Sequence, residues 1–449
     1  MRLLPVVFLA LVWPDGLATA REKNPSFTAD DVLAVQAMLS DMQKVVTLDY
    51  FPGDKIGKEF EARCAETALA LKKVQSNAEA YGLIADALAS PDPRIRFYPP
   101  ASQVRVDYSW KWQLIGDAAY VTEIDHEGDA RKQGLQLGDK VLAYEGVAIN
   151  RENYQSVYYV FKSLAPRPGL RVFVESPGAE PRWLAIAATV RPQRKLQSSG
   201  GANSFWAAWE LSASDWRHRK EFYDLKQHLH RVGPVAVWRP IELERDEVAV
   251  ADALKEIKSA SALVLDLRGL YVSQHETAAR LLDGLFADDV EVGVVKRGNR
   301  SLTDVRLRFG SGPRAFLGTV LVLVDAHTAM YAEVFARVIQ QKQRGVIIGD
   351  YTMGRVVDET SFGQTRGASF GFATAHVLVP TGEVVMADGV KLDGKGVAPD
   401  LLLRPAPADL AGERDVVLAK ALAMLKQKIS PEDARKLIRL PSEDDDDNE

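Results

Sequence analysis

The stretch ALVLDLRG at residues 262–269 decides the fold. Five of its first six residues are apolar, whereas a strand with one face in water would alternate apolar and polar residues. The apolar run ends at Arg268 and Gly269, where a strand gives way to a polar turn. The stretch therefore predicts a fully buried strand at the centre of an α/β sheet. Site residues are expected after it, because parallel sheets carry their sites at the carboxyl ends of strands.

Apolar runs and amphipathic stretches alternate along residues 233–403, on both sides of this strand. A β-α-β order of this kind favours a mainly parallel sheet with both faces covered by helices. We expect strands at residues 235–238, 262–267, 292–295, 305–309, 318–324 and 345–349. Helices are expected at 248–257, between Gly269 and Leu285, and at 329–341. The second candidate strand end for a site is DAHTAMYAE, at residues 325–333.

The segments outside this core have different patterns. Residues 26–100 predict a helical domain, in which Thr28 and Asp31 match a capping box. Residues 104–190 change to short strands separated by turns, and residues 191–232 are a polar linker or insert. Residues 404–449 predict a C-terminal helix followed by an acidic tail.

The composition limits the classes of function. The chain has 449 residues, of which 47% are hydrophobic and 26% charged, and these values exclude a disordered or multi-span membrane protein. The net charge of -5 gives no reason to expect a nucleic-acid partner. Cys64 is the only cysteine, which excludes an intramolecular disulfide and a cysteine-rich zinc site; we expect it to be a buried core residue. No metal or cofactor is predicted.

The first twenty residues are typical of a secretory signal. Arg2 precedes an apolar run from Leu3 to Trp13, and the small residues Ala18 and Ala20 follow. The run is too short to span a bilayer, and no later window predicts a transmembrane segment. We therefore expect cleavage after Ala20 and a periplasmic or secreted mature protein.

Residues 134–142, GLQLGDKVL, and residues 144–149, YEGVAI, resemble a PDZ domain of the bacterial protease type. The resemblance implies that residues 104–190 bind extended peptide ends by strand addition. The loop before this region, residues 108–112, lacks the glycines that hold a terminal carboxylate. We instead expect an aromatic groove, with Trp110, Trp112 and Tyr120 as peptide-binding residues.

The order of helical cap, PDZ-like region and α/β core is similar to that of the C-terminal processing (tail-specific) serine protease family. The supporting motifs are LDLRG at 265–269, Thr328-Ala329 with Glu333, GDYTMG at 349–354 and GKGVAPD at 394–400. The resemblance implies a crotonase-like core that cuts peptide bonds with a serine–lysine dyad. Backbone amides after the LDLRG strand are implied to stabilise the oxyanion.

The family motif places Met330 at the position of the nucleophilic serine and Arg355 at that of the general base. Methionine has no proton to give up, and arginine stays protonated in proteins. Glu359 falls at the position of an assisting glutamine and is expected to pair with Arg355. The oxyanion region begins at Gly269 and Leu270, and LYVS at residues 270–273 replaces the Asn-Pro-Gly-Gly of the family.

These changes imply a pseudopeptidase. It would bind peptides or protein C-termini, or act as an adaptor for a partner protease or envelope protein. Arg355 is a candidate for holding a carboxylate, and Met330 with Tyr331 is expected to fill the vacated pocket.

Two alternatives stay open on the sequence. The first is an active serine-type endopeptidase with a relocated site, in which Ser273 would pair with His327 or His275 and with Asp325 or Asp266. The second is a carrier of a small molecule or lipid in the apolar cleft vacated by the dyad.

Overall fold

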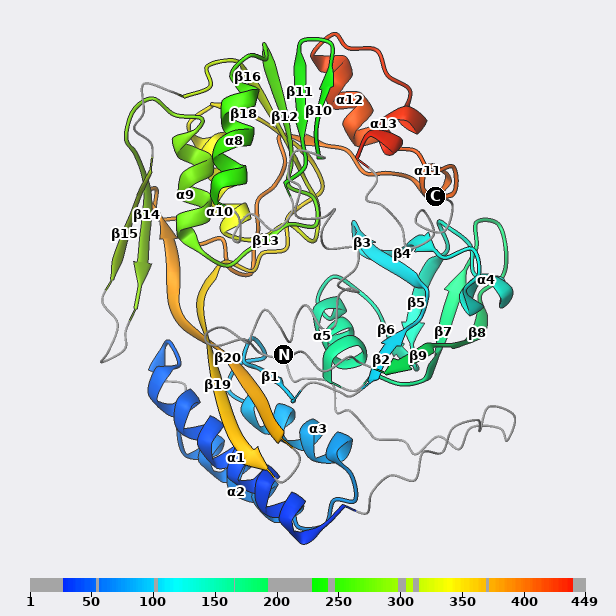
Figure 1. Cartoon of the computed structure of the whole chain (residues 1–449), viewed down its shortest axis with the longest axis vertical. Coiled ribbons are helices and arrows are strands. Elements are labelled where there is room, and N and C mark those ends of the chain that lie inside the picture. Colours follow the sequence, from blue (N-terminus) through cyan, green and yellow to red (C-terminus); the bar gives the residue numbers. More distant parts are fainter. Residues whose placement is uncertain are drawn as a thin grey trace.

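The computed structural model describes residues 27–53, 56–100, 104–164, 166–192, 228–240, 247–297, 304–309, 315–368 and 371–438. The expected signal peptide, most of the linker at 191–232 and the acidic tail lie outside these residues. Among the helices that the structure describes, none has the length and apolar character needed to cross a membrane. The chain has a mixed α/β fold (Figure 1).

The buried strand anticipated at residue 262 is the centre of a six-stranded sheet. The strand order is β10 (Leu229–Val232), β11 (Val235–Trp238), β12 (Ala262–Asp266), β16 (Thr319–Val324), β18 (Gly345–Gly349) and β21 (Leu401–Leu402). The pairs from β11 to β21 are parallel, and only β10 runs antiparallel to its neighbour. All five residues of β12 are buried, as predicted. The end of the expected linker is different from the prediction, because residues 229–232 form β10 of this sheet.

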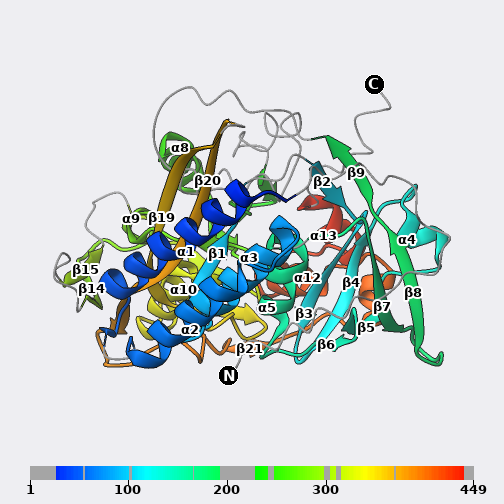
Figure 2. The ribbon, with the colours of Figure 1, turned by 90° about the horizontal axis from the view of Figure 1, so that it is seen from below.

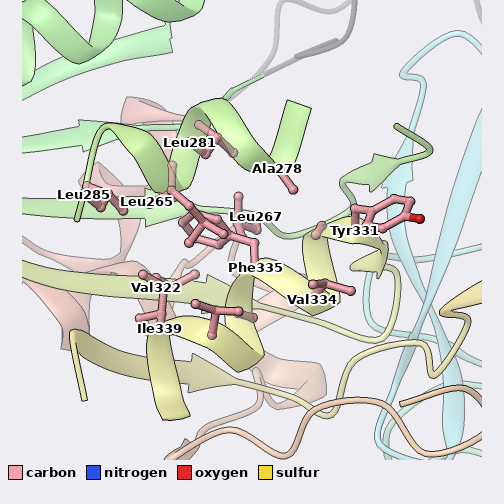
Figure 3. Close-up of a cluster of buried hydrophobic side chains, with 14 of the residues drawn as sticks. Leu265, Leu267, Ala278, Leu281, Leu285, Val322, Tyr331, Val334, Phe335 and Ile339 are labelled. Carbon is pink, nitrogen blue, oxygen red and sulfur yellow. The ribbon is translucent and has the colours of Figure 1, made fainter. Parts of the chain in front are cut away.

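Helices cover both faces of this sheet. Leu263, Leu265 and Val322 face α8 (Glu247–Ile257), α9 (His275–Asp283) and α10 (Tyr331–Gln341), and Figure 3 shows this cluster. Val264 and Leu321 point to the opposite face, towards α12 (Val416–Met424) and α13 (Pro431–Leu437). The C-terminal region thus contains α11 (Pro407–Ala411) and these two helices, where the sequence predicts one.

A long hairpin that the sequence analysis does not predict forms a second sheet. It consists of β19 (Val357–Ala368) and β20 (Gly371–Met386), and β20 also pairs with β1 (Arg96–Tyr98) and β14 (Val290–Lys296). β15 (Val305–Phe309) completes this sheet beyond β14. The hairpin extends from the core to the N-terminal helices α1 (Ala29–Asp49), α2 (Lys58–Ala70) and α3 (Asn77–Leu88) (Figures 1 and 2).

The N-terminal helices form where the sequence predicts them. The hydroxyl of Thr28 accepts the N–H of Asp31, whose carboxylate accepts the N–H of Thr28, as in a capping box. Cys64 lies inside the helical cluster, and burial raises the pKa of its thiol to about 11. The thiol is therefore a packing group and stays protonated at neutral pH.

Residues 104–192, called the β unit below, form a separate antiparallel sheet. Its strand order is β3 (Trp110–Ile115), β4 (Ala118–Ile124), β5 (Lys140–Tyr144), β7 (Gly169–Glu175) and β8 (Arg182–Ala187), with β6 (Val147–Ala148) beside β5. α4 (Asp129–Lys132), α5 (Tyr154–Tyr159), a π-helical turn (Val160–Leu164) and the pair β2 (Val104–Asp107) and β9 (Thr189–Pro192) complete it. β3 is an edge strand, and it lies beside the core loops described next (Figure 1).

Candidate functional site

Three loops meet at the carboxyl edge of the parallel sheet. They follow β12, β16 and β18, and they carry residues 267–270, 325–330 and 350–356. The short strands β13 (Tyr271–Val272) and β17 (Ala329–Met330) pair in parallel and hold two of these loops together. The two strand ends singled out in the sequence therefore lie side by side, as the parallel order requires.

Met330 lies at the sharp turn that leads into α10. Its φ of 61° and ψ of -129° fall where residues with a side chain are strained. The side chain is 1% exposed and packs against Ala329, Val357 and partly buried Tyr271. Its N–H donates to the carbonyl of Arg355 at 2.9 Å. The turn thus presents a thioether to a closed apolar cluster. Tyr331, which was expected to fill the same pocket, lies in the main core cluster instead.

Arg355 is 4% exposed, and its Nη2 donates to Oε2 of Glu359 at 2.7 Å. Glu359 also accepts the hydroxyl of Tyr271. Burial alone would lower the pKa of Arg355, but the negative charge of Glu359 raises it above its ordinary value. The guanidinium is therefore always charged and already holds a carboxylate. The predicted pairing with Glu359 is present, and it uses the charge that we proposed for a ligand.

Glu333 links this site to α10. Its carboxylate, which is completely buried, accepts the hydroxyl of Thr352 at 2.5 Å and the N–H groups of Gly354 and Arg355 at 2.7 and 2.9 Å. The N–H of Met330 donates to it as well, at 3.2 Å. Burial raises the pKa of Glu333 to about 7, and these hydrogen bonds oppose that rise. In the sequence, Glu333 is recognisable only as a motif residue, and no local pattern predicts these contacts.

The amides of the expected oxyanion region already have partners within the chain. The N–H of Gly269 donates to Oδ1 of Asp325 at 2.9 Å, and the N–H of Leu270 donates to the carbonyl of Leu267 at 3.1 Å. Gly269 has a φ of +74°, which a residue without a side chain adopts at no cost. An oxyanion at this edge would have to displace a carboxylate or a carbonyl to gain these donors.

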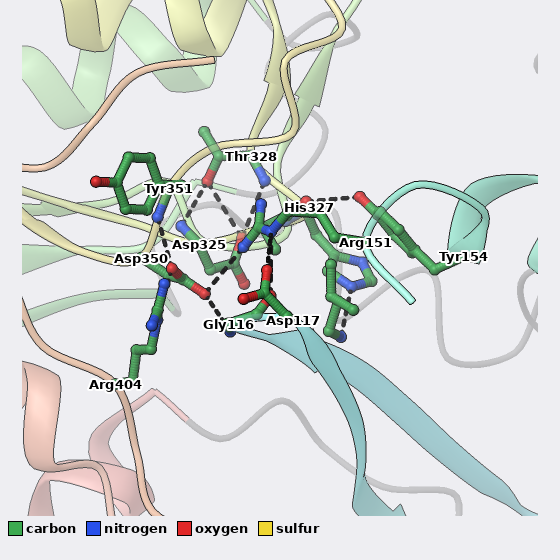
Figure 4. Close-up of polar contacts among 12 residues, drawn as sticks. Gly116, Asp117, Arg151, Tyr154, Asp325, His327, Thr328, Asp350, Tyr351 and Arg404 are labelled. Carbon is green, nitrogen blue, oxygen red and sulfur yellow. Dashed lines mark hydrogen bonds and ion pairs between the residues drawn. The ribbon is translucent and has the colours of Figure 1, made fainter. Parts of the chain in front are cut away.

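The residues of the relocated site have other partners. Nε2 of His327 accepts the N–H of Leu114 on β3 at 3.2 Å, and burial lowers the pKa of this imidazole. Asp325 accepts the backbone N–H of His327 at 2.9 Å, not a ring N–H. Figure 4 shows the His327 ring beside Tyr154 of the β unit, at 5.5 Å between ring centroids. The base of such a triad needs a free nitrogen towards its serine, and Nε2 of His327 is already an acceptor.

The remaining candidates are in structural contacts. Thr328 donates its hydroxyl to the carbonyl of Leu267 at 2.9 Å. Asp266 pairs with Arg268 at 2.8 Å and is a structural strand-end carboxylate. Nε2 of His275 lies 3.3 Å from Glu276. In the part of the chain that the structure describes, no three His, Cys, Asp or Glu side chains gather as a metal site would require.

The expected aromatic groove is not lined by the two tryptophans. Trp110 and Trp112 are 5% and 6% exposed, and both pack on Tyr144 in the core of the β unit. The sequence predicted that they face a ligand because this segment is aromatic and lacks the usual glycines. Trp110 and Trp112 instead alternate with exposed Lys111 along β3 and point into the sheet's own core. Tyr120 is half-buried and lines a cleft of about 500 Å³.

Asp350, directly after β18, joins the β unit to the core. It is 5% exposed and accepts the N–H of Gly116 at 2.7 Å, Nε of Arg404 at 2.8 Å and Nη2 of Arg151 at 3.3 Å (Figure 4). Gly116 belongs to the β3–β4 turn and Arg151 precedes α5. Asp350 lies within the GDYTMG motif, but its three partners are far away in the sequence, so no local pattern predicts this contact.

Comparisons with known proteins agree with this fold. Residues 235–402 match the model of peptidase family S41. The chain is 23% identical, over 366 residues, to the chloroplastic C-terminal processing peptidase of Tetradesmus obliquus, covering 77% of this chain and 73% of that one.

Solved structures of CPAF are similar in fold at 13% identity. Mature CPAF complexed with lactacystin matches with a TM-score of 0.56, covering 91% of this chain and 99% of that chain. A CPAF mutant matches with a TM-score of 0.60, covering 85% and 94%. The resemblance seen in the sequence motifs is confirmed, and the chain is a homologue of the C-terminal processing proteases that carries a peptidase family S41 domain over residues 235–402.

Proposed function

We propose that this chain is a pseudopeptidase, which binds peptide segments or protein tails without cutting them. One observation carries the proposal: Met330 occupies the turn at the start of α10, closed in an apolar cluster, where the family motif has its nucleophile. Arg355, at the position of the base, is charged and paired with Glu359. A nucleophile and a neutral base are both required for the family's chemistry, and this site has neither.

The rest of the assignment follows from the resemblance. We assign residues 104–190 to a PDZ-like domain and residues 233–403 to a crotonase-like core, with residues 26–100 as a helical cap. Export after cleavage at Ala20 would place the chain in the periplasm or outside the cell. Its partners there would be protein tails, envelope proteins or an active protease.

The alternative of a relocated serine peptidase has less support. Its base, His327, accepts a backbone N–H from Leu114, and its acid, Asp325, binds backbone N–H groups. A carrier function has less support as well, because protein side chains fill the cluster around Met330.

Whether the chain cleaves proteins is tested by detecting newly formed peptide termini by mass spectrometry. The mature protein is incubated with unfolded proteins beside the Met330→Ser/Arg355→Lys double variant and an active C-terminal processing peptidase as the positive control. We expect no new termini with the wild type. We expect none with the double variant either, because Gly269 and Leu270 keep their intrachain hydrogen bonds. Cleavage by the wild type that disappears in Ser273→Ala would establish the relocated site.

Binding is tested separately. Fluorescence anisotropy of labelled peptides of varied C-terminal sequence should give saturable binding to the mature wild-type chain. Absence of saturable binding to all of them would contradict the proposal.

A further inference from the structure

The β unit and the core form a cleft away from the degenerate dyad. It lies between the β3–β4 turn, the strands β4 and β5, and residues 404–407, and its volume is about 500 Å³. Its lining residues are Ile115, Gly116, Asp117, Ala118, Tyr120, Lys140, Val141, Leu142, Ile149, Arg404, Pro405 and Pro407. The edge of β3 is a different surface, because the N–H of Leu114 there is bonded to His327.

Two glycines with positive φ let the segment 404–407 close over the strands. A Cβ on Gly138 would come within 2.5 Å of the carbonyl oxygen of Pro407, and a Cβ on Gly116 within 3.3 Å of the Arg404 guanidinium. Asp350 fixes the same two elements, since it binds the N–H of Gly116 and Nε of Arg404. The cleft is therefore held in shape by the fold before any ligand enters.

The cleft has cations above an apolar floor. Lys140 is half-buried, and within the described residues its ammonium has no ion-pair partner. Arg404, also a lining residue, contacts Asp350 through Nε, and its Nη1 would lie 3.3 Å from a Cβ on Gly116. Ile115, Leu142 and Ile149 supply the apolar floor.

The remaining polar groups fit an acidic ligand. Tyr120 is the register partner of Lys140 across β4 and β5, so its hydroxyl is on the same side. Asp117 is the acidic lining residue; its side chain is 91% exposed and lies 3.5 Å from Nε of Arg151, which offsets its charge. Arg404 is paired with Asp350, and Glu175 is the register partner of Lys140 across β5 and β7 without forming an ion pair with it. Among the described residues, Lys140 is therefore the lining cation whose charge is not already paired.

We propose that this cleft binds a separate acidic peptide, with one carboxylate between Lys140 and Arg404 and a neighbouring apolar side chain on the floor. Lysine and arginine donors bind carboxylates through charge-assisted hydrogen bonds, and an apolar floor adds area and fixes the direction of the peptide. The inference rests on the proposed peptide-binding function and names its site and ligand chemistry. It leaves Arg355 out of peptide binding.

The test uses two labelled peptides that differ only in an aspartate or an asparagine beside a leucine. Anisotropy is measured with the full mature chain, with Lys140→Gln and with Lys132→Gln, which removes the same charge from α4 outside the cleft. We expect Lys140→Gln to weaken binding of the aspartate peptide about tenfold, a loss typical of one charge-assisted hydrogen bond. Lys132→Gln should leave its affinity unchanged, and the asparagine peptide should bind weakly to all three chains.

Equal affinities of Lys140→Gln and Lys132→Gln for the aspartate peptide would overturn the inference and leave the proposed function standing. Failure of every peptide to bind any chain would instead contradict the proposed function. Tyr120→Phe serves as a second variant if Lys140→Gln does not fold. It should lower the affinity for the aspartate peptide and leave that for the asparagine peptide unchanged.

The chain's own tail, SEDDDDNE at residues 442–449, supplies carboxylates without an apolar neighbour and is a separate arm of the test. A chain ending at residue 441 should bind the aspartate peptide with the affinity of the full chain. Tighter binding by the shortened chain, reversed by adding a synthetic tail peptide, would show that the tail occupies the cleft. This result would overturn the assignment to a separate peptide.

Discussion

Two residues of the candidate site are fixed by their neighbours: Met330 by apolar packing and Arg355 by an ion pair. The guanidinium of Arg355 and the carboxylate of Glu359 are both almost completely buried, with side chains 5% and 3% exposed. Removing one member of such a pair leaves the other charge without compensation in a medium of low polarity. The pair is therefore a structural element of this site, and its value to the fold can be measured apart from any activity.

We expect Arg355→Met to lower the free energy of unfolding by about 3–5 kcal/mol, because Glu359 is left buried without its partner. The double variant Arg355→Met/Glu359→Met should regain most of that loss, since two apolar side chains replace the pair. Chemical denaturation of the wild type, both single variants and the double variant measures this cycle. Additive losses in the double variant would show that the two side chains are not coupled.

Glu333 gives the site a dependence of stability on pH. Its folded-state pKa of about 7 is higher than the ordinary value of 4.5, so the folded state holds a proton that the unfolded state releases between these values. The stability that this protonated carboxyl contributes is complete below pH 4.5 and is lost as the pH rises from there through about 7. The free energy of unfolding of the wild type minus that of Glu333→Gln should fall by about 2–3 kcal/mol between pH 5 and pH 8. A difference that is constant or rises with pH would contradict the assignment.

At the scale of elements, the loops after β16 and β18 do more than present side chains. His327 covers one amide of the edge strand β3, and Asp350 holds the β3–β4 turn. The edge through which a PDZ-like unit would add a strand is thus partly satisfied by the chain itself. The loops after β16 and β18 therefore both hold the β unit against the core and carry residues of the candidate site.

We expect Asp350→Asn to loosen this docking, because the carboxylate accepts from Gly116 and from the guanidinium groups of Arg151 and Arg404. Hydrogen exchange of the Gly116 amide should become about tenfold faster or more, as loss of one charge-assisted hydrogen bond implies. Asp117→Asn is the matched control, since that side chain is 91% exposed, and it should leave this amide unchanged. Equal exchange rates in both variants would mean that Asp350 does not hold the unit.

On the scale of the whole molecule, the hairpin β19–β20 connects parts that are far apart in the sequence. Its base pairs with β14 of the core region, and further along β20 pairs with β1 and contacts α1. Val377 and Val379 are fully buried among the side chains of the N-terminal helices, Leu39 and Met42 among them. The N-terminal helices and the hairpin therefore share one apolar core.

Val377→Ala should lower the free energy of unfolding by about 2 kcal/mol, since it removes two buried methyl groups and leaves a cavity. Amides of both β20 and α1 should exchange faster, while those of β12 should not change. Glu383→Gln, on the same strand but outside this cluster, is the control. Faster exchange confined to β20 would show that the helices are stable without the hairpin.

Sequence patterns predicted those elements whose burial is uniform or strictly periodic. β12 and β16 are continuous apolar runs, and α1 begins at a capping box, so local residues alone specify them. β19 and β20 were missed because residues such as Gly363, Thr365 and Gly371 interrupt any alternation, and long-range pairing decides their structure.

The same division applies to the candidate site. The pairing of Arg355 with Glu359 could be predicted, because it is read from opposite charges four residues apart in the sequence. The burial of Trp110 and Trp112 could not be predicted, because an alternating pattern does not say which face of the strand is the core. The contacts of Asp350 could not be predicted either, because its partners on the β unit and after β21 lie far away in the sequence.

The buried pair at Arg355 also has an evolutionary consequence. Met330→Ser alone would place a hydroxyl beside an arginine that takes no proton, and Arg355→Lys alone would leave an ammonium held by Glu359. Neither step gives natural selection a gain in cleavage to act on, while each disturbs a packed interior. In the proposed pseudopeptidase, the pair therefore opposes a stepwise return to cleavage, while mutations elsewhere that alter binding meet no such obstacle.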